Sequence, residues 1–309
     1  MSRSNSEPPA IAVGPEGSPA WVQDAVEAGG GHVVPLGDAT GLVWTSPTDA
    51  DGLRDALDAH PHLDWVQLPF AGVEHYVHLV DRRRRWTCGK GVYAEPVAEM
   101  ALTLALAGMR GFGTYARAGS WSAPHGTNLL GARVTILGGG GITESLVRLL
   151  DPFDCHVTVV RNRVQDMEGV DDVLEADRYA DALPGADLVV LALALTPETQ
   201  HLISRGELEL MERHAWLVNV ARGRHIVTDD LVAALQEGII GGAGLDVTDP
   251  EPLPEGHPLW RSPRCLITPH VGNTPEMAVP LLGERITTNV RRYGQDEELI
   301  GPVEPDLGY

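Results

Sequence analysis

Short apolar runs alternate with amphipathic stretches through the first third of the chain. The strand-like runs are Ile11–Gly14, His32–Pro35, Leu42–Trp44 and Leu63–Leu68. Between them, Trp21–Ala28 and Leu53–His60 have the spacing of short helices, and three glycines follow the first of these. Strands that alternate with helices predict a parallel sheet with helices crossing over its faces.

A second, longer alternation begins after residue 130. Its strand-like runs are Arg133–Leu137, His156–Val160, Asp187–Leu193, Ala215–Asn219, Gly242–Val247 and Cys265–Thr268. Six runs at this spacing predict a second α/β unit of the doubly wound type, with parallel strands. A last amphipathic helix is predicted at about Met277–Tyr293.

One segment between the two alternations has a different pattern. Pro96–Met109 is apolar on nearly every side, and a helix of that kind is buried. Pro96 suits the first turn of such a helix. We expect this helix to lie between domains or between subunits, since a chain of 309 residues has room for about two domains.

The charge balance narrows the classes of partner. Lys plus Arg number 23 and Asp plus Glu number 43, which gives a formal net charge of −20. Nucleic acids and anionic membranes both select basic surfaces, so neither is an expected partner. The basic cluster Asp81–Arg85 is interpreted as a solvated connection before the next strand.

The three cysteines, Cys88, Cys155 and Cys265, are too few and too widely spaced for a disulfide framework or a zinc motif. We therefore expect reduced thiols and no metal. The first ten residues are polar and rich in proline, without the apolar core of a signal peptide, and predict a loose tail. The apolar runs are too short to span a membrane. These features predict a cytoplasmic protein.

A glycine-rich turn follows the first strand of the second alternation. Val134–Leu137 runs into Gly138-Gly-Gly-Gly-Ile-Thr-Glu144, and a helix is predicted at Ser145–Leu150. Glycines at such a turn let backbone N–H groups approach a dinucleotide pyrophosphate. Gly138 and Gly140 fit the G-x-G-x-x-G pattern, but Thr143 occupies its third position. We expect Thr143 to weaken the packing of the helix or to push it outward; the alternative is a purely structural turn.

The tip of the next strand bears on the choice of cofactor. NAD-specific enzymes place an acidic side chain there, on the ribose 2′-hydroxyl. Here Arg161 and Arg163 follow the strand and no carboxylate is present at the tip. Arginines attract a 2′-phosphate, so the sequence favours NADP. The alternative is a solvated loop tip in an enzyme that uses NAD.

Several motifs occur in one order along the chain. They are Val97-Ala-Glu-Met100, Leu193-Ala-Leu-Thr-Pro-Glu-Thr199, Asn219-Val-Ala-Arg-Gly223, Gly244-Leu-Asp-Val247 with Glu251-Pro-Leu253, and Thr268-Pro-His-Val-Gly272. With these motifs the chain resembles the D-isomer-specific 2-hydroxyacid dehydrogenases. The resemblance implies reduction of a small 2-keto acid to a D-2-hydroxy acid, by hydride transfer from a nicotinamide cofactor.

The resemblance also implies a catalytic trio. Arg222 would clamp the substrate's carboxylate and keto oxygen, His270 would be the acid/base, and Glu251 would fix the tautomer of His270. A guanidinium stays charged at any working pH, and imidazole ordinarily titrates close to neutral pH, so both residue types suit these roles. Asp246 would face the nicotinamide. The loop Phe70–Val73 would offer N–H groups to the carboxylate, so the substrate-binding residues that we expect are Ala71, Gly72, Val73 and Arg222.

The glycine turn and the resemblance together give a set of cofactor contacts. They are Gly138, Gly140, Gly141, Ile142, Thr143, Arg161, Arg163, Ala194, Thr199, Val220, Ala221, Asp246 and His270. The implied fold has two doubly wound domains. A Rossmann cofactor domain, residues 95–273, is inserted into a flavodoxin-like substrate domain made of residues 1–94 and 274–309. The resemblance further implies a homodimer.

Other interpretations stay open at this point. A phosphite or formate-type dehydrogenase could use the same scaffold, although formate enzymes carry Gln where Glu251 stands. Some relatives are dinucleotide-sensing corepressors rather than enzymes. The side chain of the keto acid is not encoded in any motif. Trp121, His125 and Asn128 could shape a substrate pocket or a subunit contact, and Trp260 is expected in the core.

Overall fold

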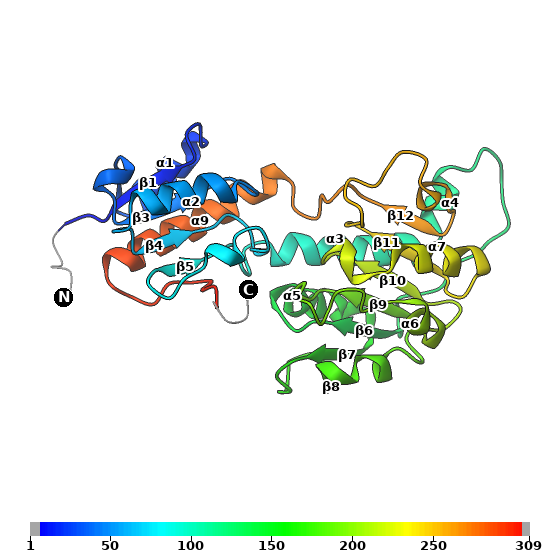
Figure 1. Ribbon diagram of the computed structural model, residues 1–309. Helices are drawn as coiled ribbons and strands as arrows, with labels where there is room; N and C mark the ends of the chain where they lie inside the picture. Colours follow the sequence, from blue (N-terminus) through cyan, green and yellow to red (C-terminus); the bar gives the residue numbers. More distant parts are fainter. Residues whose placement is uncertain (1–6, 305–309) are drawn as a thin grey trace. The chain divides into compact units, whose positions relative to one another are not determined.

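The computed structural model describes residues 7–304, and the chain divides into two compact units (Figure 1). The first unit holds the described residues up to Tyr93 together with those from Thr274 onward. The second unit is Ala94–Asn273. Each unit contains one parallel sheet, which confirms the prediction of an α/β protein with two such sheets.

The sheet of the first unit has five strands in the order β2-β1-β3-β4-β5. The strands are β1 (Ala10–Gly14), β2 (His32–Val33), β3 (Gly41–Trp44), β4 (Trp65–Gln67) and β5 (Arg85–Thr87). Its helices are α1 (Ala20–Ala28), α2 (Ala50–Ala59) and α9 (Pro275–Gly294), with short 3₁₀ turns η1 (Leu36–Asp38) and η2 (Val77–Leu79). This strand order is that of flavodoxin-like folds, in which ligands bind at the carboxyl ends of the strands.

Helix α9 joins the first unit through specific contacts. It packs against α1, where the Thr287 hydroxyl donates to the Ala25 carbonyl at 2.9 Å. The buried Asn289 amide donates to Gln67 Oε1 at 2.8 Å and to the Ile300 carbonyl at 2.9 Å. Because Gln67 is itself fully buried on β4, this amide supplies a hydrogen-bond donor to a polar side chain inside the core.

The sheet of the second unit has seven strands in the order β12-β11-β10-β9-β6-β7-β8. The strands are β6 (Arg133–Leu137), β7 (His156–Arg161), β8 (Asp172–Glu175), β9 (Leu188–Leu191), β10 (Trp216–Asn219), β11 (Gly242–Leu245) and β12 (Cys265–Ile267). This is the Rossmann order with one strand added. All strands are parallel, and the order in which the chain adds them changes direction between β6 and β9.

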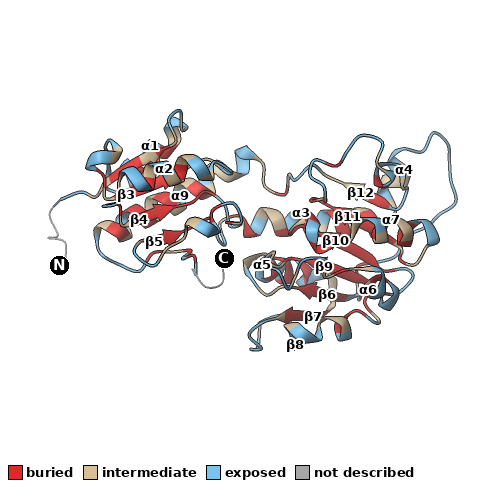
Figure 2. Cartoon of the chain, in the orientation of Figure 1, coloured by how far each residue is buried: buried red, intermediate tan, exposed pale blue. Residues whose placement is uncertain are grey.

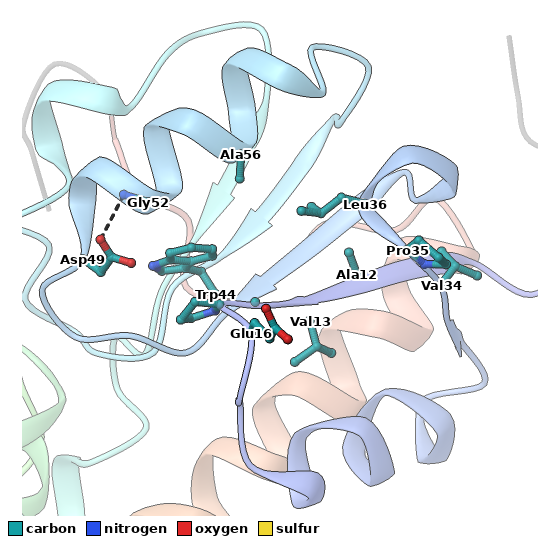
Figure 3. Close-up of a pocket in the computed structure, with 12 residues that line it drawn as sticks. Ala12, Val13, Glu16, Val34, Pro35, Leu36, Trp44, Asp49, Gly52 and Ala56 are labelled. Atoms are coloured by element: carbon teal, nitrogen blue, oxygen red, sulfur yellow. Dashed lines mark hydrogen bonds between the residues drawn. The ribbon is translucent and has the colours of Figure 1, made fainter.

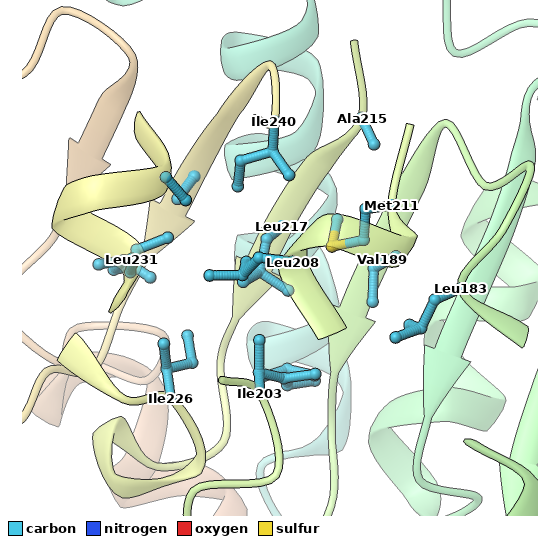
Figure 4. Packing of buried hydrophobic residues seen from close by; sticks show 14 of the residues in the cluster. Leu183, Val189, Ile203, Leu208, Met211, Ala215, Leu217, Ile226, Leu231 and Ile240 are labelled. Atoms are coloured by element: carbon cyan, nitrogen blue, oxygen red, sulfur yellow. The ribbon is translucent and has the colours of Figure 1, made fainter. Parts of the chain in front are cut away.

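Helices cover both faces of this second sheet. The helices are α3 (Ala94–Met109), α4 (Phe112–Ala116), α5 (Gly141–Leu150), α6 (Arg205–Leu210), α7 (Thr228–Glu237) and α8 (Pro258–Arg261), with 3₁₀ segments η3 (Asp151–Phe153), η4 (Ala176–Ala182) and η5 (Gly223–His225). One apolar cluster involves α3 and α5. In the other, shown in Figure 4, Leu217 of β10 packs with Leu208 of α6 and Leu231 of α7. Strands are largely buried, whereas most helices keep an exposed side (Figure 2).

Several element boundaries differ from the sequence-based prediction. Strand β8 was not predicted, because Asp172–Glu175 is a four-residue edge strand without an apolar run. Helix α2 begins at Ala50, before the predicted start, because the Asp49 side chain caps it by accepting the Gly52 N–H. Helix α5 begins at Gly141 rather than Ser145. Helix α3 begins two residues before Pro96, and its acidic positions are exposed, so it is less completely buried than expected.

The prediction that the basic cluster Asp81–Arg85 is solvated is only partly correct. Only 5% of the Arg84 side chain is exposed, because it pairs with Asp81 and donates to the Leu63 carbonyl at 3.2 Å. Burial alone would raise the pKa of Asp81, but hydrogen bonds and charge from Arg84 and Arg83 outweigh it and lower that pKa. Arg85 stacks over the Tyr293 ring at 4.7 Å. The cluster therefore anchors the start of β5.

The predictions for the cysteines and for Trp260 have different outcomes. The three cysteines are free, as predicted, and burial raises the pKa of Cys265 to about 12, which keeps its thiol unreactive. Trp260 is 49% exposed, so the prediction that it lies in the core is wrong.

Most of the predicted loose tail lies outside the described residues, and β1 already begins at Ala10. Within residues 7–304, none of the helices has the length and apolar character needed to cross a bilayer.

Candidate active site

The three predicted catalytic residues follow three neighbouring strands. Arg222 follows β10, Glu251 follows β11 and His270 follows β12. Because β10 pairs with β11 and β11 with β12, all in parallel, the carboxyl ends of these strands meet at one edge of the sheet. The fold therefore brings the loops of all three residues to the same edge of the second unit.

His270 and Glu251 form a direct pair. Nδ1 of His270 lies 2.7 Å from Oε1 of Glu251, and the two side chains are 50% and 42% exposed. This bond places the Nδ1 proton toward the carboxylate and leaves Nε2 for a substrate. The pair has the geometry of an acid/base histidine with an orienting carboxylate.

The backbone of His270 is held in an unusual conformation. Its φ is +54°, in the left-handed region that non-glycine residues seldom adopt. The His270 N–H donates to the Asp246 carbonyl at 2.8 Å. Such a conformation persists only where the surroundings fix it.

Asp246 provides much of that fixation. Its side chain is buried, and its two carboxylate oxygens accept the Thr268 hydroxyl at 2.6 Å and the N–H groups of Val271 and Gly272 at 2.9 Å each. Both oxygens are therefore engaged by the loop that carries His270. Sequence reasoning assigned Asp246 only to the nicotinamide and missed this positioning contact.

Arg222 lies on a turn that Asn219 shapes from both sides. Asn219 Oδ1 accepts the Ala221 N–H at 3.0 Å, and its amide donates to the Arg222 carbonyl at 2.8 Å. The next residue, Gly223, packs so closely on the Thr248 carbonyl that a side chain would not fit there. Because Thr248 begins the loop that leads to Glu251, the Arg222 turn and that loop are in contact.

The glycine turn between β6 and α5 has the form expected of a pyrophosphate site. Gly138 has a φ of +115°, and a Cβ there would overlap the Ala192 carbonyl. Gly140 precedes the first residue of α5 and has open space where its side chain would be. Helix α5 therefore directs free N–H groups toward this space.

Thr143 does not have the predicted cost to packing. It is fully buried, and its hydroxyl donates to the Gly138 carbonyl at 2.7 Å. The β-branched residue thus closes the turn with a hydrogen bond that a third glycine could not make. The expectation that Thr143 weakens the helix packing is wrong.

The predicted 2′-phosphate residues lie beside this turn. Arg161 ends β7, and its side chain covers Gly139, whose Cβ would lie 2.7 to 2.9 Å from Arg161 atoms. Arg163 is exposed two residues later. One of the two guanidinium groups is therefore folded over the glycine turn itself.

A buried histidine that sequence reasoning missed connects two further predicted segments. His225 is fully buried, and its ring nitrogens face the Thr199 carbonyl at 2.9 Å and the Leu193 carbonyl at 3.3 Å. The Thr199 hydroxyl in turn donates to the Ala194 carbonyl at 2.8 Å. His225 comes three residues after Arg222, so it ties the Arg222 segment to the loop 193–199. Its only sequence signal was its place beside the Arg222 motif.

Two buried residues and two aromatic residues complete the comparison with the prediction. Val220 and Ala221 are buried directly after β10, on the edge where the other site residues lie. Trp121 is fully exposed, on a stretch in which every residue from 116 to 128 is exposed. His125 stacks on Tyr115 at 4.4 Å. Neither Trp121 nor His125 lines one of the described pockets.

The predicted substrate loop belongs to the first unit, between β4 and η2. Ala71 is exposed, Gly72 is half-buried and the Val73 side chain is buried. The same unit has a cavity of about 670 Å³ at the carboxyl ends of β1 and β3, walled by Trp44, Leu36 and Ala56 (Figure 3). The residues that line this cavity include none of the predicted site residues.

The comparisons with known proteins point to one family. Residues 100–272 match the family model for the D-isomer specific 2-hydroxyacid dehydrogenase, NAD binding domain. An uncharacterised protein of Corynebacterium melassecola is 37% identical over 92% of this chain and 95% of its own. A glyoxylate reductase of Thermofilum pendens is 31% identical over 82% of this chain and 77% of its own.

Among solved structures, a D-isomer specific 2-hydroxyacid dehydrogenase from Xanthobacter autotrophicus, in complex with NADPH and MES, has a TM-score of 0.85. It is 26% identical, over 98% of this chain and 100% of that one. The family match covers more than half of the chain. The chain therefore belongs to the D-isomer-specific 2-hydroxyacid dehydrogenases, a family of oxidoreductases that depend on NAD or NADP.

Proposed function

We propose that this protein reduces a small 2-keto acid to the D-2-hydroxy acid, and catalyses the reverse reaction. His270 is the acid/base, Glu251 orients it and Arg222 holds the substrate. The observation that carries this proposal is the 2.7 Å bond between His270 and Glu251, on loops at the strand edge where Arg222 also lies. The family supplies the class of reaction, and the pair supplies the proton that the reaction needs.

The residues of the second unit fit a dinucleotide. The open space at Gly140, the start of α5 and the crowded Gly138 together form a backbone cradle for a pyrophosphate. We propose that the second unit holds the cofactor through the turn 138–143 and the segments 193–199 and 220–221, and that the first unit holds the substrate. The nicotinamide would supply a hydride to the keto carbon.

The protein's own groups then have defined tasks. His270 donates its Nε2 proton to the keto oxygen, so that no free alkoxide forms. The resulting neutral ring keeps the proton on Nδ1, which stays hydrogen-bonded to Glu251. Arg222 offers a charged fork to the carboxylate and the keto oxygen. In the first unit, the N–H groups of Ala71, Gly72 and Val73 are the proposed donors to a substrate carboxylate. Asp246 faces the nicotinamide end while its carboxylate holds the His270 loop.

We propose NADP as the preferred cofactor. Arg161 lies over Gly139, so a guanidinium is already beside the place where the adenosine ribose would emerge from the turn. A 2′-phosphate gains a charge-assisted bond there. The similar protein from Xanthobacter autotrophicus was solved with NADPH, which supports this choice.

For the substrate we propose glyoxylate or hydroxypyruvate. The glyoxylate reductase of Thermofilum pendens and the glyoxylate/hydroxypyruvate reductase A of Serratia proteamaculans support this class. The latter is 34% identical over 57% of this chain. We also propose a homodimer, formed through α3 and the exposed stretch that carries Trp121, because aromatic residues are enriched at protein–protein interfaces and Trp121 is fully exposed in the single chain.

The test is reduction of a small panel of 2-keto acids with NADPH and NADH in parallel. We expect NADPH oxidation with glyoxylate or hydroxypyruvate, and a fall of about a hundredfold or more in kcat for His270→Ala, since general acid catalysis is worth about 10²–10⁴-fold. His214→Ala is the matched control, because His214 also pairs with a carboxylate but precedes β10, at the amino end of the strand rather than at the carboxyl end where the site lies.

Three results would each count against a part of the proposal. If the wild-type protein binds NADPH but turns over no keto acid, a dinucleotide sensor or a dehydrogenase for an inorganic substrate such as phosphite becomes the better interpretation. If turnover occurs but survives in His270→Ala, the family reaction stands and the assignment of its acid/base is wrong. A preference for NADH would overturn the role of Arg161.

A further inference from the structure

The predicted substrate loop has three successive carbonyl groups that all face one neighbouring segment. The Tyr93 hydroxyl donates to the Pro69 carbonyl at 2.9 Å, and the Gly89 N–H donates to the Phe70 carbonyl at 3.0 Å. The Cys88 thiol approaches the Ala71 carbonyl at 3.8 Å. The loop therefore has the segment 88–93 on its carbonyl side.

This orientation fixes where the N–H groups of the loop point. In a trans peptide the C=O and the following N–H point in opposite directions, and the cis bonds among the described residues lie elsewhere. The N–H groups of Phe70, Ala71 and Gly72 therefore face away from the segment 88–93. Among the described residues, none accepts a hydrogen bond from the N–H of Ala71, whose residue is exposed.

The approach of the two segments depends on Gly89. A Cβ at this position would lie 2.6 Å from the Pro69 carbonyl oxygen and 3.1 Å from the Phe70 carbonyl carbon. Only a residue without a side chain allows the Gly89 N–H to reach the Phe70 carbonyl. The peptide Cys88–Gly89 is thus stacked directly behind the peptide Phe70–Ala71.

A cation lies at the other end of this arrangement. Nη1 of Arg285, on α9, donates to the carbonyl groups of Cys88 and Lys90 at 3.0 Å each. Within residues 7–304, the partners of this guanidinium are these backbone carbonyls and not a carboxylate. Burial lowers the pKa of Arg285, but a guanidinium remains protonated in proteins. Its positive charge is therefore not paired with a carboxylate among the described residues.

We propose that Arg285 is a positioning residue for substrate binding, whose charge reaches the Ala71 N–H through two peptide groups. Nη1 donates to the Cys88 carbonyl, the Gly89 N–H of the same peptide donates to the Phe70 carbonyl, and the Ala71 N–H of that peptide faces the anion. Hydrogen bonds in such a chain polarise one another. The Ala71 N–H becomes a stronger donor than an ordinary amide. The identity of the anion, a 2-keto acid carboxylate, rests on the proposed function.

Three substitutions separate charge from contact. Arg285→Gln removes the charge but keeps an amide that can donate to a carbonyl, Arg285→Lys keeps the charge, and Arg285→Met keeps only the apolar stem. Arg291→Gln is the matched control, since Arg291 is an exposed arginine on the same helix. Thermal unfolding of each variant shows whether the fold is retained.

The first measurement tests the relay without any ligand. Phe70–Ala71 is the single Phe–Ala pair in the sequence, so labelling Phe at its carbonyl carbon and Ala at nitrogen makes the Ala71 amide uniquely visible by NMR. We expect the ¹⁵N and ¹H shifts of Ala71 to move to lower frequency in Arg285→Gln and Arg285→Met, and to stay near the wild-type values in Arg285→Lys and Arg291→Gln. Unchanged shifts in folded Arg285→Gln would overturn the relay.

The second measurement tests its use in binding. Because a charge-assisted bond is roughly twice as strong as a neutral one, we expect Arg285→Gln to raise the KM for the keto acid about fivefold, with kcat and the KM for NADPH nearly unchanged. Arg285→Lys should restore most of the loss. An equal fall in kcat for all three variants would show a merely structural residue and overturn the proposal. If the wild type turns over no keto acid, the proposed function fails, and the Ala71 shifts alone decide whether the relay exists.

Discussion

At the scale of single residues, two carboxylates support His270 in different ways. Glu251 bonds the ring, whereas the Asp246 carboxylate accepts the Thr268 hydroxyl before His270 and two backbone N–H groups after it. The left-handed backbone conformation of His270 costs on the order of 1–3 kcal/mol, so it persists only because contacts with its surroundings offset that cost. The network around Asp246 supplies that hold, so the direction of the imidazole depends on a residue that does not touch it.

Substitution of Asp246 should therefore impair catalysis through the loop. In Asp246→Asn, the side-chain NH2 group must face the backbone N–H of Val271 or Gly272, a donor that it cannot satisfy, which costs about 1–3 kcal/mol. We expect a lower unfolding temperature and a fall of about tenfold or more in kcat. Thr268→Val removes a single donor of the network and should have a smaller effect of the same kind.

Steady-state kinetics and thermal unfolding check this order of effects. A folded Asp246→Asn enzyme with wild-type kcat would show that the loop holds His270 without the carboxylate. A loss in Thr268→Val larger than that in Asp246→Asn would place the main support elsewhere.

At the scale of elements, the site is made by turns that follow strands, and His225 ties two of them. Its ring lies between the carbonyl groups of Leu193 and Thr199, and its own segment η5 continues the Arg222 turn. A neutral imidazole has one N–H, so it can donate to one of these carbonyls at a time. The tie limits how far the cofactor segment and the Arg222 turn can move apart.

The variant His225→Phe fills the same buried space without either hydrogen bond. We expect the Kd for NADPH to rise about tenfold, because the carbonyl that accepts the His225 N–H loses its donor and the loop 193–199 loosens. Quenching of tryptophan fluorescence by NADPH measures the Kd. His214→Phe, at an exposed histidine, is the control, and an unchanged Kd in a folded His225→Phe protein would refute the tie.

The sequence predicted most elements of the fold, because apolar periodicity reports burial directly. It missed β8, whose polar edge carries no such signal, and it placed the starts of α2 and α5 too late, because caps and glycine turns act through geometry. For the candidate site, it predicted residues that bear chemistry, such as His270 and Arg222. It could not predict Asp246 as an anchor or Arg285 behind Gly89, since those contacts join residues far apart in the chain.

At the scale of the whole molecule, the proposed dimer would cover the exposed stretch with Trp121 and the partly exposed side of α3. If a second copy covers them, sedimentation equilibrium should give about twice the 33.1 kDa mass of one chain. Trp121→Ser should weaken the dimer, because a buried aromatic anchor carries much of an interface. Phe112→Ser, another exposed aromatic on the same unit, serves as comparison.

A monomer at micromolar concentration, with full activity, would count against this dimer. The charge of −20 sets the conditions of the measurement, since like charges on two acidic chains repel each other less as salt is added. Association that strengthens with salt would fit an apolar contact between acidic protomers, whereas association that salt abolishes would indicate a different, polar interface.

The return of α9 to the first unit has a consequence for how the protein is made. A ribosome delivers β1 to β5 first, then roughly 180 residues of the second unit, and only then α9. At the usual pace of translation, about 5–20 residues per second, the first sheet waits on the order of ten seconds or more for its last helix. Through that interval Gln67 lacks the Asn289 amide that completes its hydrogen bonds in the finished core. The nascent chain thus holds an unfinished first half while the second unit, complete in one continuous stretch, is free to fold.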